Sequence, residues 1–339
     1  MRKNYYKMDK FSKIRAYRCG WLLQLIDWPI VFPGIYLNMH RTTSSVRVKG
    51  AEHVRQRFWP FPKHPGHLFL TNHRDIVLDA AYMSVMLRQE KNIRPFMGIG
   101  NNLFGKWWIE PVVRLMRCFV VIRDSKGLHE QMANSQLLSE YIREQIEHGR
   151  SVWLAQREGR AKDGNDRTQP SVIKMLTMSG ESKDLLQKVR ELNICPVSIN
   201  YEYDPCDYLK AQEMQLKRDD ATWKKTKQDD ILSMATGIKG QKGRVVYHFT
   251  PSINGWIDAN EEELRTMNRN QQIDAICRQI DHQIHANYED YDRTSPEFEA
   301  YLKSRLALID IPNKDEAFLM DKLHEMYNNP VINKQAALQ

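Results

Sequence analysis

The chain has 339 residues, 42% hydrophobic and 27% charged, a balance that is ordinary for a globular protein with a substantial core. Five cysteines, an odd number without a Cys-x-x-Cys pair, argue for a reducing compartment and against a zinc site. The formal net charge of +8 allows nucleic acid or an anionic membrane as a partner, but no zinc-finger, helix-turn-helix or RNA-binding motif supports nucleic acid.

The N-terminal residues are typical of a membrane-surface anchor. Residues 1–18 carry seven Lys and Arg against one Asp, and an aromatic and aliphatic run follows at 20–37. Basic residues suit lipid headgroups, and aromatic residues suit the boundary between headgroups and acyl chains. Asp27 and two prolines interrupt the run, which disfavours a full span. We predict that residues 1–44 bind the cytoplasmic face of a membrane as a peripheral or monotopic anchor. A transmembrane or re-entrant segment and a buried core helix are the alternatives.

Strand and helix patterns alternate beyond this anchor. Short apolar runs predict strands at 46–49, 67–71, 94–98, 118–122, 151–155, 194–200 and 244–249. Apolar periodicity predicts helices at 76–87, 104–116 and 135–147. This order predicts an α/β fold with a mainly parallel, twisted sheet and helices on both faces. We expect an α/β domain at 45–258, with a solvated charged insertion near 202–242. A helical C-terminal extension at 259–339 would follow, with a frayed tail at 334–339.

Residues 71–81, Thr-Asn-His-Arg-Asp-Ile-Val-Leu-Asp-Ala-Ala, occupy a predicted turn from strand to helix. A neutral imidazole such as that of His73 can take a proton from an alcohol if a carboxylate holds its other ring nitrogen. Asp75 and Asp79 follow two and six residues later, and spacing alone does not choose between them. The central His-Arg-Asp imitates a protein-kinase signature, but Ala80 stands where that signature needs Asn, so a kinase is excluded.

Later blocks also follow predicted strands. Arg123 ends an apolar strand, where side chains reach clefts at the carboxyl edge of a sheet. The block 153–170 is rich in Arg, Lys and Gly, and its candidate residues are Glu158, Gly159, Arg160 and Lys162. Guanidinium groups and glycine-exposed amides suit a phosphate or carboxylate, and a solvated charged turn is the alternative. Pro196, inside the predicted strand 194–200, implies an edge, a bulge or a special local shape.

Taken in this order, the blocks resemble those of the glycerolipid acyltransferases, the glycerol-3-phosphate and 1-acylglycerol-3-phosphate acyltransferase superfamily, over roughly residues 45–255. The corresponding residues are Asn72-His73, Arg123, Glu158-Gly159-Arg160 and Cys195-Pro196-Val197. The family pattern places an Asp five residues after the His, where this chain has Leu78. Either Asp79 or Asp75 fills that role, and we favour Asp79 because loops absorb one extra residue easily. The Thr expected between Gly159 and Arg160 is missing.

The resemblance implies an O-acyltransferase that moves a fatty acyl group from acyl-CoA or acyl-carrier protein to a hydroxyl of a glycerophosphate or lysophospholipid. It implies no metal and no cofactor other than this acyl donor. His73 would be the general base, oriented by Asp79 or Asp75. The residues that would bind substrate are Asn72, Arg74, Arg123, Glu158, Gly159, Arg160 and Lys162. The expected partner is a membrane lipid surface, without nucleic acid. An acyl-thioester hydrolase and a non-catalytic membrane-binding relative are the alternatives.

Overall fold

The computed structural model describes residues 32–54, 65–101, 117–123 and 125–339. Residues 1–31 of the predicted anchor and the predicted helix 104–116 lie outside these ranges. The described strands are β1 (Ser45–Lys49), β2 (Leu68–Thr71), β3 (Phe96–Gly100), β4 (Cys118–Val121), β5 (Val152–Ala155), β6 (Ile194–Tyr201) and β7 (Arg244–Phe249). Each of them falls on a strand that the sequence predicted, with bounds that differ by at most two residues.

The described helices begin with α3 (Phe32–Thr42), the short η2 (Ala51–His53), α4 (Leu78–Lys91), α6 (Leu128–Glu147), α7 (Pro170–Leu176), α8 (Leu185–Leu192), α9 (Asp207–Asp219) and α10 (Lys227–Lys239). They continue with α11 (Asn254–Ala259), α12 (Glu261–Thr266), α13 (Arg269–Ala286), α14 (Pro296–Ala307) and α15 (Glu316–Leu338). The predicted frayed tail at 334–339 is wrong, because α15 continues to Leu338. None of the helices among the described residues combines the length and apolar character needed to cross a membrane.

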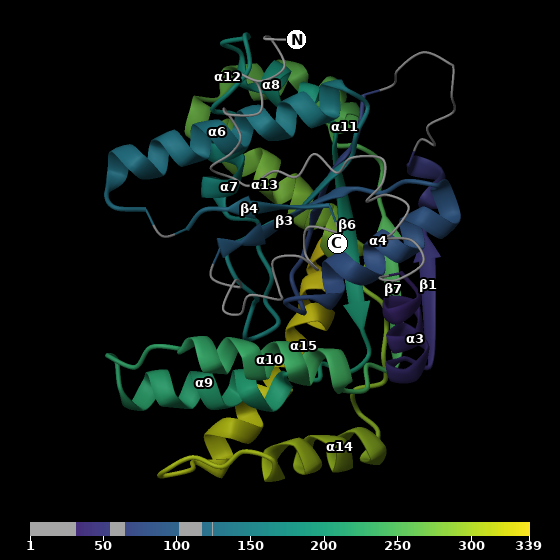
Figure 1. Ribbon diagram of the computed structural model, residues 1–339, viewed down its shortest axis with the longest axis vertical. Coiled ribbons are helices and arrows are strands. Elements are labelled where there is room, and N and C mark those ends of the chain that lie inside the picture. Colours follow the sequence, from purple (N-terminus) through teal and green to yellow (C-terminus); the bar gives the residue numbers. More distant parts are fainter. Residues whose placement is uncertain (1–31, 55–64, 102–116, 124) are drawn as a thin grey trace.

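The strands form one seven-stranded sheet in the order β1-β7-β6-β2-β5-β3-β4. All neighbouring pairs are parallel except β6 and β7, so the predicted mainly parallel α/β sheet is confirmed. Because β2, β4, β5 and β6 run in one direction, the segments that follow them leave the sheet at the same edge. The arrowhead of β6 points toward α9 and α10 at that edge (Figure 1). The candidate residues after these strands therefore gather on one side of the molecule.

Alternate strand residues point to opposite faces of the sheet and fill two cores. Leu68 and Leu70 of β2 lie in one core, with side chains from α6, α7, α8, α11, α12 and α13. Phe69 lies between them in sequence and belongs to the second core, with side chains from α3 and α4. Helices therefore cover both faces of the sheet, as the alternating sequence pattern predicted (Figure 1).

A third core joins α9, α14 and α15 beyond the sheet. The stretch 202–242 was expected to be solvated, but it forms α9 and α10, and the inner face of α9 is buried. Lys210, Glu213 and Gln215 are all less than 9% exposed. The prediction of a solvated stretch is therefore wrong for α9: a run of charged residues also forms a helix whose polar groups are paired inside the protein.

Pro196 lies in the interior of the sheet, which excludes the edge position that a proline allows. Residue Leu70 of β2 pairs with it on one side. Its carbonyl accepts hydrogen bonds from the backbone N–H and the hydroxyl of Thr250, just past the end of β7. In a strand the N and the C=O of one residue point the same way, so the missing donor of Pro196 also faces Thr250. The carbonyl of Thr250, which an N–H at position 196 would reach, accepts the thiol of Cys195 at 2.9 Å instead.

Candidate active site

The turn between β2 and α4 holds an imidazole and a carboxylate in direct contact. Nδ1 of His73 lies 2.9 Å from Oδ2 of Asp79, in the first turn of α4. The same Oδ2 accepts the backbone N–H groups of Arg74 at 2.7 Å and Asp75 at 3.0 Å. Because a carboxylate oxygen only accepts, Nδ1 carries the hydrogen and Nε2 is left with a lone pair. The His73 side chain is 11% exposed and Asp79 is fully buried.

Asp75 has a different contact. Its Oδ1 accepts the backbone N–H groups of Val77 and Leu78, both at 2.8 Å, so it caps the start of α4. Burial, and then the charge of Asp79, raise the pKa of Asp75. Of the two carboxylates that the sequence left open, Asp79 is the one hydrogen-bonded to the imidazole.

Asn72 is fully buried and bonded to a neighbouring strand. Its Nδ2 donates to the carbonyl of Ile199 in β6 at 2.9 Å, and its Oδ1 accepts the N–H of the same residue at 2.7 Å. These two bonds use the amide and fix the beginning of the turn to β6. The structure therefore gives this predicted substrate-binding residue a role in the fold of the corner.

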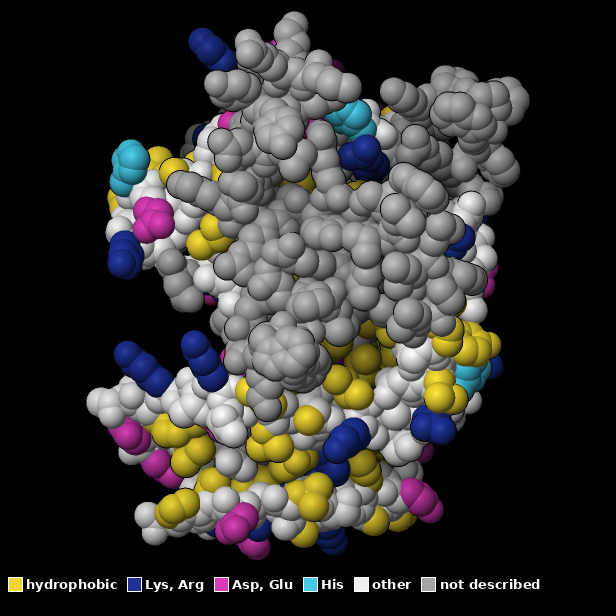
Figure 2. All heavy atoms as spheres, in the orientation of Figure 1, with side chains coloured by type: hydrophobic (Ala, Val, Ile, Leu, Met, Phe, Trp, Pro, Cys, Tyr) yellow, Lys and Arg dark blue, Asp and Glu magenta, His cyan; other side chains and the backbone are white. Residues whose placement is uncertain are grey.

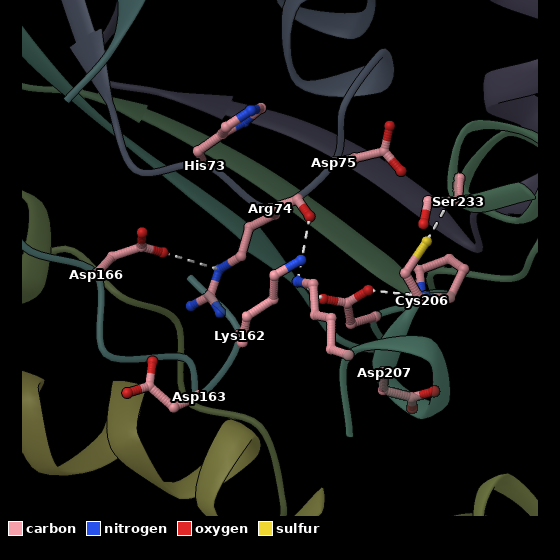
Figure 3. Close-up of polar contacts among 12 residues, drawn as sticks. His73, Arg74, Asp75, Lys162, Asp163, Asp166, Cys206, Asp207 and Ser233 are labelled. Atoms are coloured by element: carbon pink, nitrogen blue, oxygen red, sulfur yellow. Dashed lines mark hydrogen bonds and ion pairs between the residues drawn. The ribbon is translucent and has the colours of Figure 1, made fainter. Parts of the chain in front are cut away.

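Arg74 points away from His73 toward a buried acid. Its Nε lies 4.0 Å from Oδ2 of Asp166 (Figure 3). Its guanidinium lies 5.7 Å from the ring centre of Tyr288. Burial disfavours its charge, but Tyr288 and Asp166 outweigh burial and raise the pKa of Arg74. The Nζ of Lys210 in α9 donates to the backbone carbonyl of Arg74 at 3.3 Å. The turn is therefore held from α9 as well as from within.

Residues 156–169, which we call the β5–α7 loop, follow β5, and C-terminal helices hold this loop in place. The carboxylate of Asp281 in α13 accepts the N–H and the hydroxyl of Thr168 at 2.7 and 2.6 Å. Nε2 of His285 lies 2.8 Å from the carbonyl of Asp166. Gly164 has a positive φ of 76°, and a Cβ there would lie 2.1 Å from a backbone oxygen of α15.

The predicted basic residues of this loop are enclosed to different degrees. Arg160 is 7% exposed; burial disfavours its charge, but Cys206, Asp75 and Asp204 outweigh burial and raise its pKa. The Nζ of Lys162 donates to Glu213 of α9 at 2.6 Å. Burial, followed by the charge of Arg160, lowers the pKa of Lys162 to about 8. Figure 3 shows Asp75 on the side of Cys206 and Ser233, and Asp166 on the opposite side beside Arg74.

Arg123 and Glu158 lie together at the more open part of the site. The Nε of Arg123 is 3.8 Å from Oε1 of Glu158, whose side chain is 68% exposed. Gly159 follows with a positive φ of 69° and open space around it. The segments after β4 and β5 therefore meet, as their places at one sheet edge predicted.

Several buried donors in the β5–α7 loop have no hydrogen-bond partner among the described residues. They are Nε2 of Gln156, Nε of Arg157 and Nη1 of Arg160. Both carboxylate oxygens of Asp166 also lack a hydrogen bond among the described residues, and burial, opposed by Arg74 and Arg157, raises the pKa of this carboxyl. The sequence reasoning missed Asp166, Lys210, Asp281 and His285. No spacing rule could have found Asp281 and His285, since the chain folds back from more than 100 residues away to bring them to the loop.

Comparison with known proteins gives one family match. Residues 45–200 match the family described as Acyltransferase. No curated protein matches the sequence. Among solved structures, the chain is similar to the 1-acyl-sn-glycerophosphate (LPA) acyltransferase PlsC from Thermotoga maritima, with 12% identity and a TM-score of 0.37. That similarity covers 84% of this chain and 91% of the other.

Proposed function

Because residues 45–200 match the acyltransferase family, we propose that the chain moves a fatty acyl group from a thioester donor to a hydroxyl of a glycerophosphate or lysophospholipid. The donor is acyl-CoA or acyl-carrier protein. The observation that carries this proposal is the His73–Asp79 pair, 2.9 Å apart on a turn that Asn72 fixes to β6.

His73 is the general base in this proposal. Its Nε2 takes the proton of the acceptor hydroxyl while Asp79 keeps the hydrogen on Nδ1 and stabilises the imidazolium. The acceptor oxygen attacks the thioester carbonyl carbon and forms the new C–O bond. The C–S bond then breaks, and the leaving thiolate takes the proton back from Nε2. The products are an ester and a free thiol, without an acyl-enzyme intermediate.

The β5–α7 loop supplies positive charge that would bind an anionic acceptor substrate. The unpartnered donors of Arg157 and Arg160 suit the oxygens of a phosphate, since guanidinium groups bind such oxygens with several N–H groups. Arg123, with its side chain 31% exposed, is the more accessible cation of the site. We propose that these three arginines hold the phosphate while the hydroxyl reaches His73. Lys162, paired with Glu213 of α9, adds a further basic group to this loop.

The test measures free thiol released from long-chain acyl-CoA and acyl-carrier protein by the full-length protein with vesicles. Lysophosphatidate, glycerol 3-phosphate and other lysolipids are each added or left out. We expect release that depends on an acceptor, and a loss of about 10²-fold or more in His73→Ala. His148→Ala, which changes an exposed histidine at the end of α6, is the matched control and should stay active.

Two results contradict the proposal. Thiol release that is independent of every acceptor would favour the hydrolase instead. Equal acceptor-dependent release from wild type and His73→Ala would remove the imidazole from the chemistry. Mass analysis of the lipid product then identifies the acceptor class when the expected result is obtained.

A further inference from the structure

Helix α10 packs directly against the catalytic corner. Gly237 faces Asp75 so closely that an added Cβ would lie 2.0 Å from the Asp75 carboxylate oxygen. One turn earlier, Ser233 is buried, and its carbonyl accepts the thiol of Cys206 at 3.2 Å. The inner face of α10 is therefore built from small residues that allow close approach to the turn carrying His73.

The outer face of α10 is apolar and exposed. Leu232 is 50% exposed and Ile238 is 36% exposed, and on the neighbouring helix α3 Tyr36 and Leu37 are 39% and 50% exposed. We call these four side chains the α3–α10 face. Hydrophobic side chains gather over α10 and toward α3 in the lower half of Figure 2. A single exposed apolar residue is ordinary, but a group on two adjoining helices indicates an interaction surface.

Two hydrogen bonds join the helices into one surface. Nδ2 of Asn38 in α3 donates to the carbonyl of Ile238 in α10 at 2.8 Å. Nε2 of Gln241, just after α10, donates to the carbonyl of Arg41 at 3.1 Å. The two helices are therefore held together, and the α3–α10 face is one continuous surface.

The charges around this face match an anionic lipid surface. Helix α3 contains no acidic residue and ends with His40 and Arg41, and α10 begins and ends with the exposed Lys227 and Lys239. The chain enters α3 from the N-terminal segment whose residues 1–18 carry seven Lys and Arg against one Asp. Apolar side chains bordered by basic ones bind at the headgroup boundary of anionic membranes.

The acidic residues of α10 are already engaged. Asp229 forms the capping box with Thr226, and Asp230 pairs with Lys225 at 2.6 Å. Their charges are therefore partly balanced within the protein and oppose binding to anionic lipid less than free carboxylates would.

We propose that the α3–α10 face docks on an anionic lipid bilayer, with Leu232 and Ile238 at the level of the headgroups. This inference rests on the proposed function, because a lipid acceptor and product lie in the bilayer. Docking through α10 places the opposite side of that helix, and the catalytic corner against it, next to the membrane. A segment that the sequence analysis interpreted as a solvated insertion thereby becomes part of the membrane contact.

Vesicle sedimentation tests the surface directly. Full-length protein is mixed with vesicles of equal parts phosphatidylcholine and phosphatidylglycerol, or of phosphatidylcholine alone. The double variant Leu232→Gln/Ile238→Gln is expected to bind the anionic vesicles about tenfold more weakly, because the two apolar side chains no longer enter the boundary region. The matched control is Leu128→Gln/Met132→Gln, which changes two exposed apolar residues of α6 and should bind like wild type.

A fluorescent label gives a second readout, which a folding defect in a variant used for sedimentation cannot affect. An environment-sensitive dye on Leu232→Cys, in a Cys19→Ser background, should shift to the blue on anionic vesicles. The same dye on Leu308→Cys, at the end of α14, should not shift. Labelling is selective because the other four cysteines are buried.

Three results would overturn the proposal: unchanged vesicle binding by the α10 variant, equal loss in the α6 control, or no shift of the dye at position 232. A dimer that the α10 variant converts to a monomer, with vesicle binding unchanged, would make the face a contact between two copies of the chain. The proposed chemistry is scored separately, since His73→Ala should bind vesicles like wild type while losing acyl transfer.

Discussion

His285 of α13 holds the β5–α7 loop in place, and its surroundings keep its imidazole neutral. Its Nε2 donates to the carbonyl of Asp166 at 2.8 Å, and the ring is only 2% exposed. Burial lowers the pKa of His285 from 6.5 to about 4, and the positive charges of Arg167 and Arg74 act in the same direction. The folded protein therefore keeps this imidazole neutral at a pH where the unfolded chain would protonate it.

The expected loss of stability follows from these two pKa values. Between about pH 6.5 and pH 4 the unfolded state binds the additional proton, so the free energy of unfolding falls as the pH falls. A difference of roughly 2.5 units at 1.36 kcal/mol per unit is about 3 kcal/mol by pH 4. Above about pH 6.5 His285 contributes no pH dependence.

The variant His285→Gln isolates this effect, because the Gln Nε2 can donate to the same carbonyl but does not titrate. Urea unfolding of both proteins across the acidic range measures the difference between their free energies of unfolding. We expect the difference to shift by about 3 kcal/mol toward the variant as the pH falls to about 4. His148→Gln, at an exposed position, should show no shift. Parallel curves for wild type and His285→Gln would refute the reasoning.

Five further substitutions test the site and its surroundings. Asp79→Asn should lower kcat by about 10²- to 10⁴-fold, because the imidazole loses the carboxylate that fixes its tautomer. Asp75→Ala should mainly weaken the cap of α4, by about 1 kcal/mol in urea unfolding, and equal losses of kcat in the two variants would contradict these roles. Gly164→Ala should melt at a lower temperature than Gly159→Ala. Both positions have positive φ, but only at Gly164 would the added Cβ meet a backbone oxygen, 2.1 Å away. Equal melting temperatures would disprove this steric argument. Burial lowers the pKa of Lys242 from 10.5 to about 8. The free energy of unfolding of wild type should therefore rise by about 3 kcal/mol relative to that of Lys242→Met as the pH rises from about 8 to 10.5. A constant difference between the two proteins in urea unfolding would count against a buried ammonium.

The sheet could be predicted from the sequence because its strands are short apolar runs separated by turn residues. Helix α8 was not predicted, although Asp184 caps it and apolar residues recur at 185, 186, 189 and 192. Its signal was present but short. The extent of α15 could not be predicted in the same way, because Pro330 inside it reads as a helix breaker. The structure accommodates this proline near the end of a long helix that packs on α9 and α14.

The candidate site divides similarly into local and distant parts. His73, Asp75 and Asp79 are neighbours in sequence, so the turn and its two carboxylates were predictable as a group. Which carboxylate contacts the imidazole depends on the fold of the turn, where two backbone N–H groups converge on Asp79. Lys210 could not be predicted, because its partner, the carbonyl of Arg74, lies 136 residues earlier and carries no sequence signal.

The buried charges around the corner are better explained by positioning than by stability. Lys210 is 1% exposed and pairs with Asp204, whose pKa is lowered by this partner against the opposing effect of burial. Taking both charges out of water costs free energy that their attraction does not reliably return, so an apolar pair would stabilise the fold at least as well. What an apolar pair could not do is donate to the carbonyl of Arg74, the residue between His73 and Asp75. Since Tyr327 of α15 also donates to Asp207 at the start of α9, the C-terminal helices and the charged stretch together hold one turn from outside the sheet. The precision of the His73–Asp79 pair therefore depends on parts of the chain that carry none of the acyltransferase motifs.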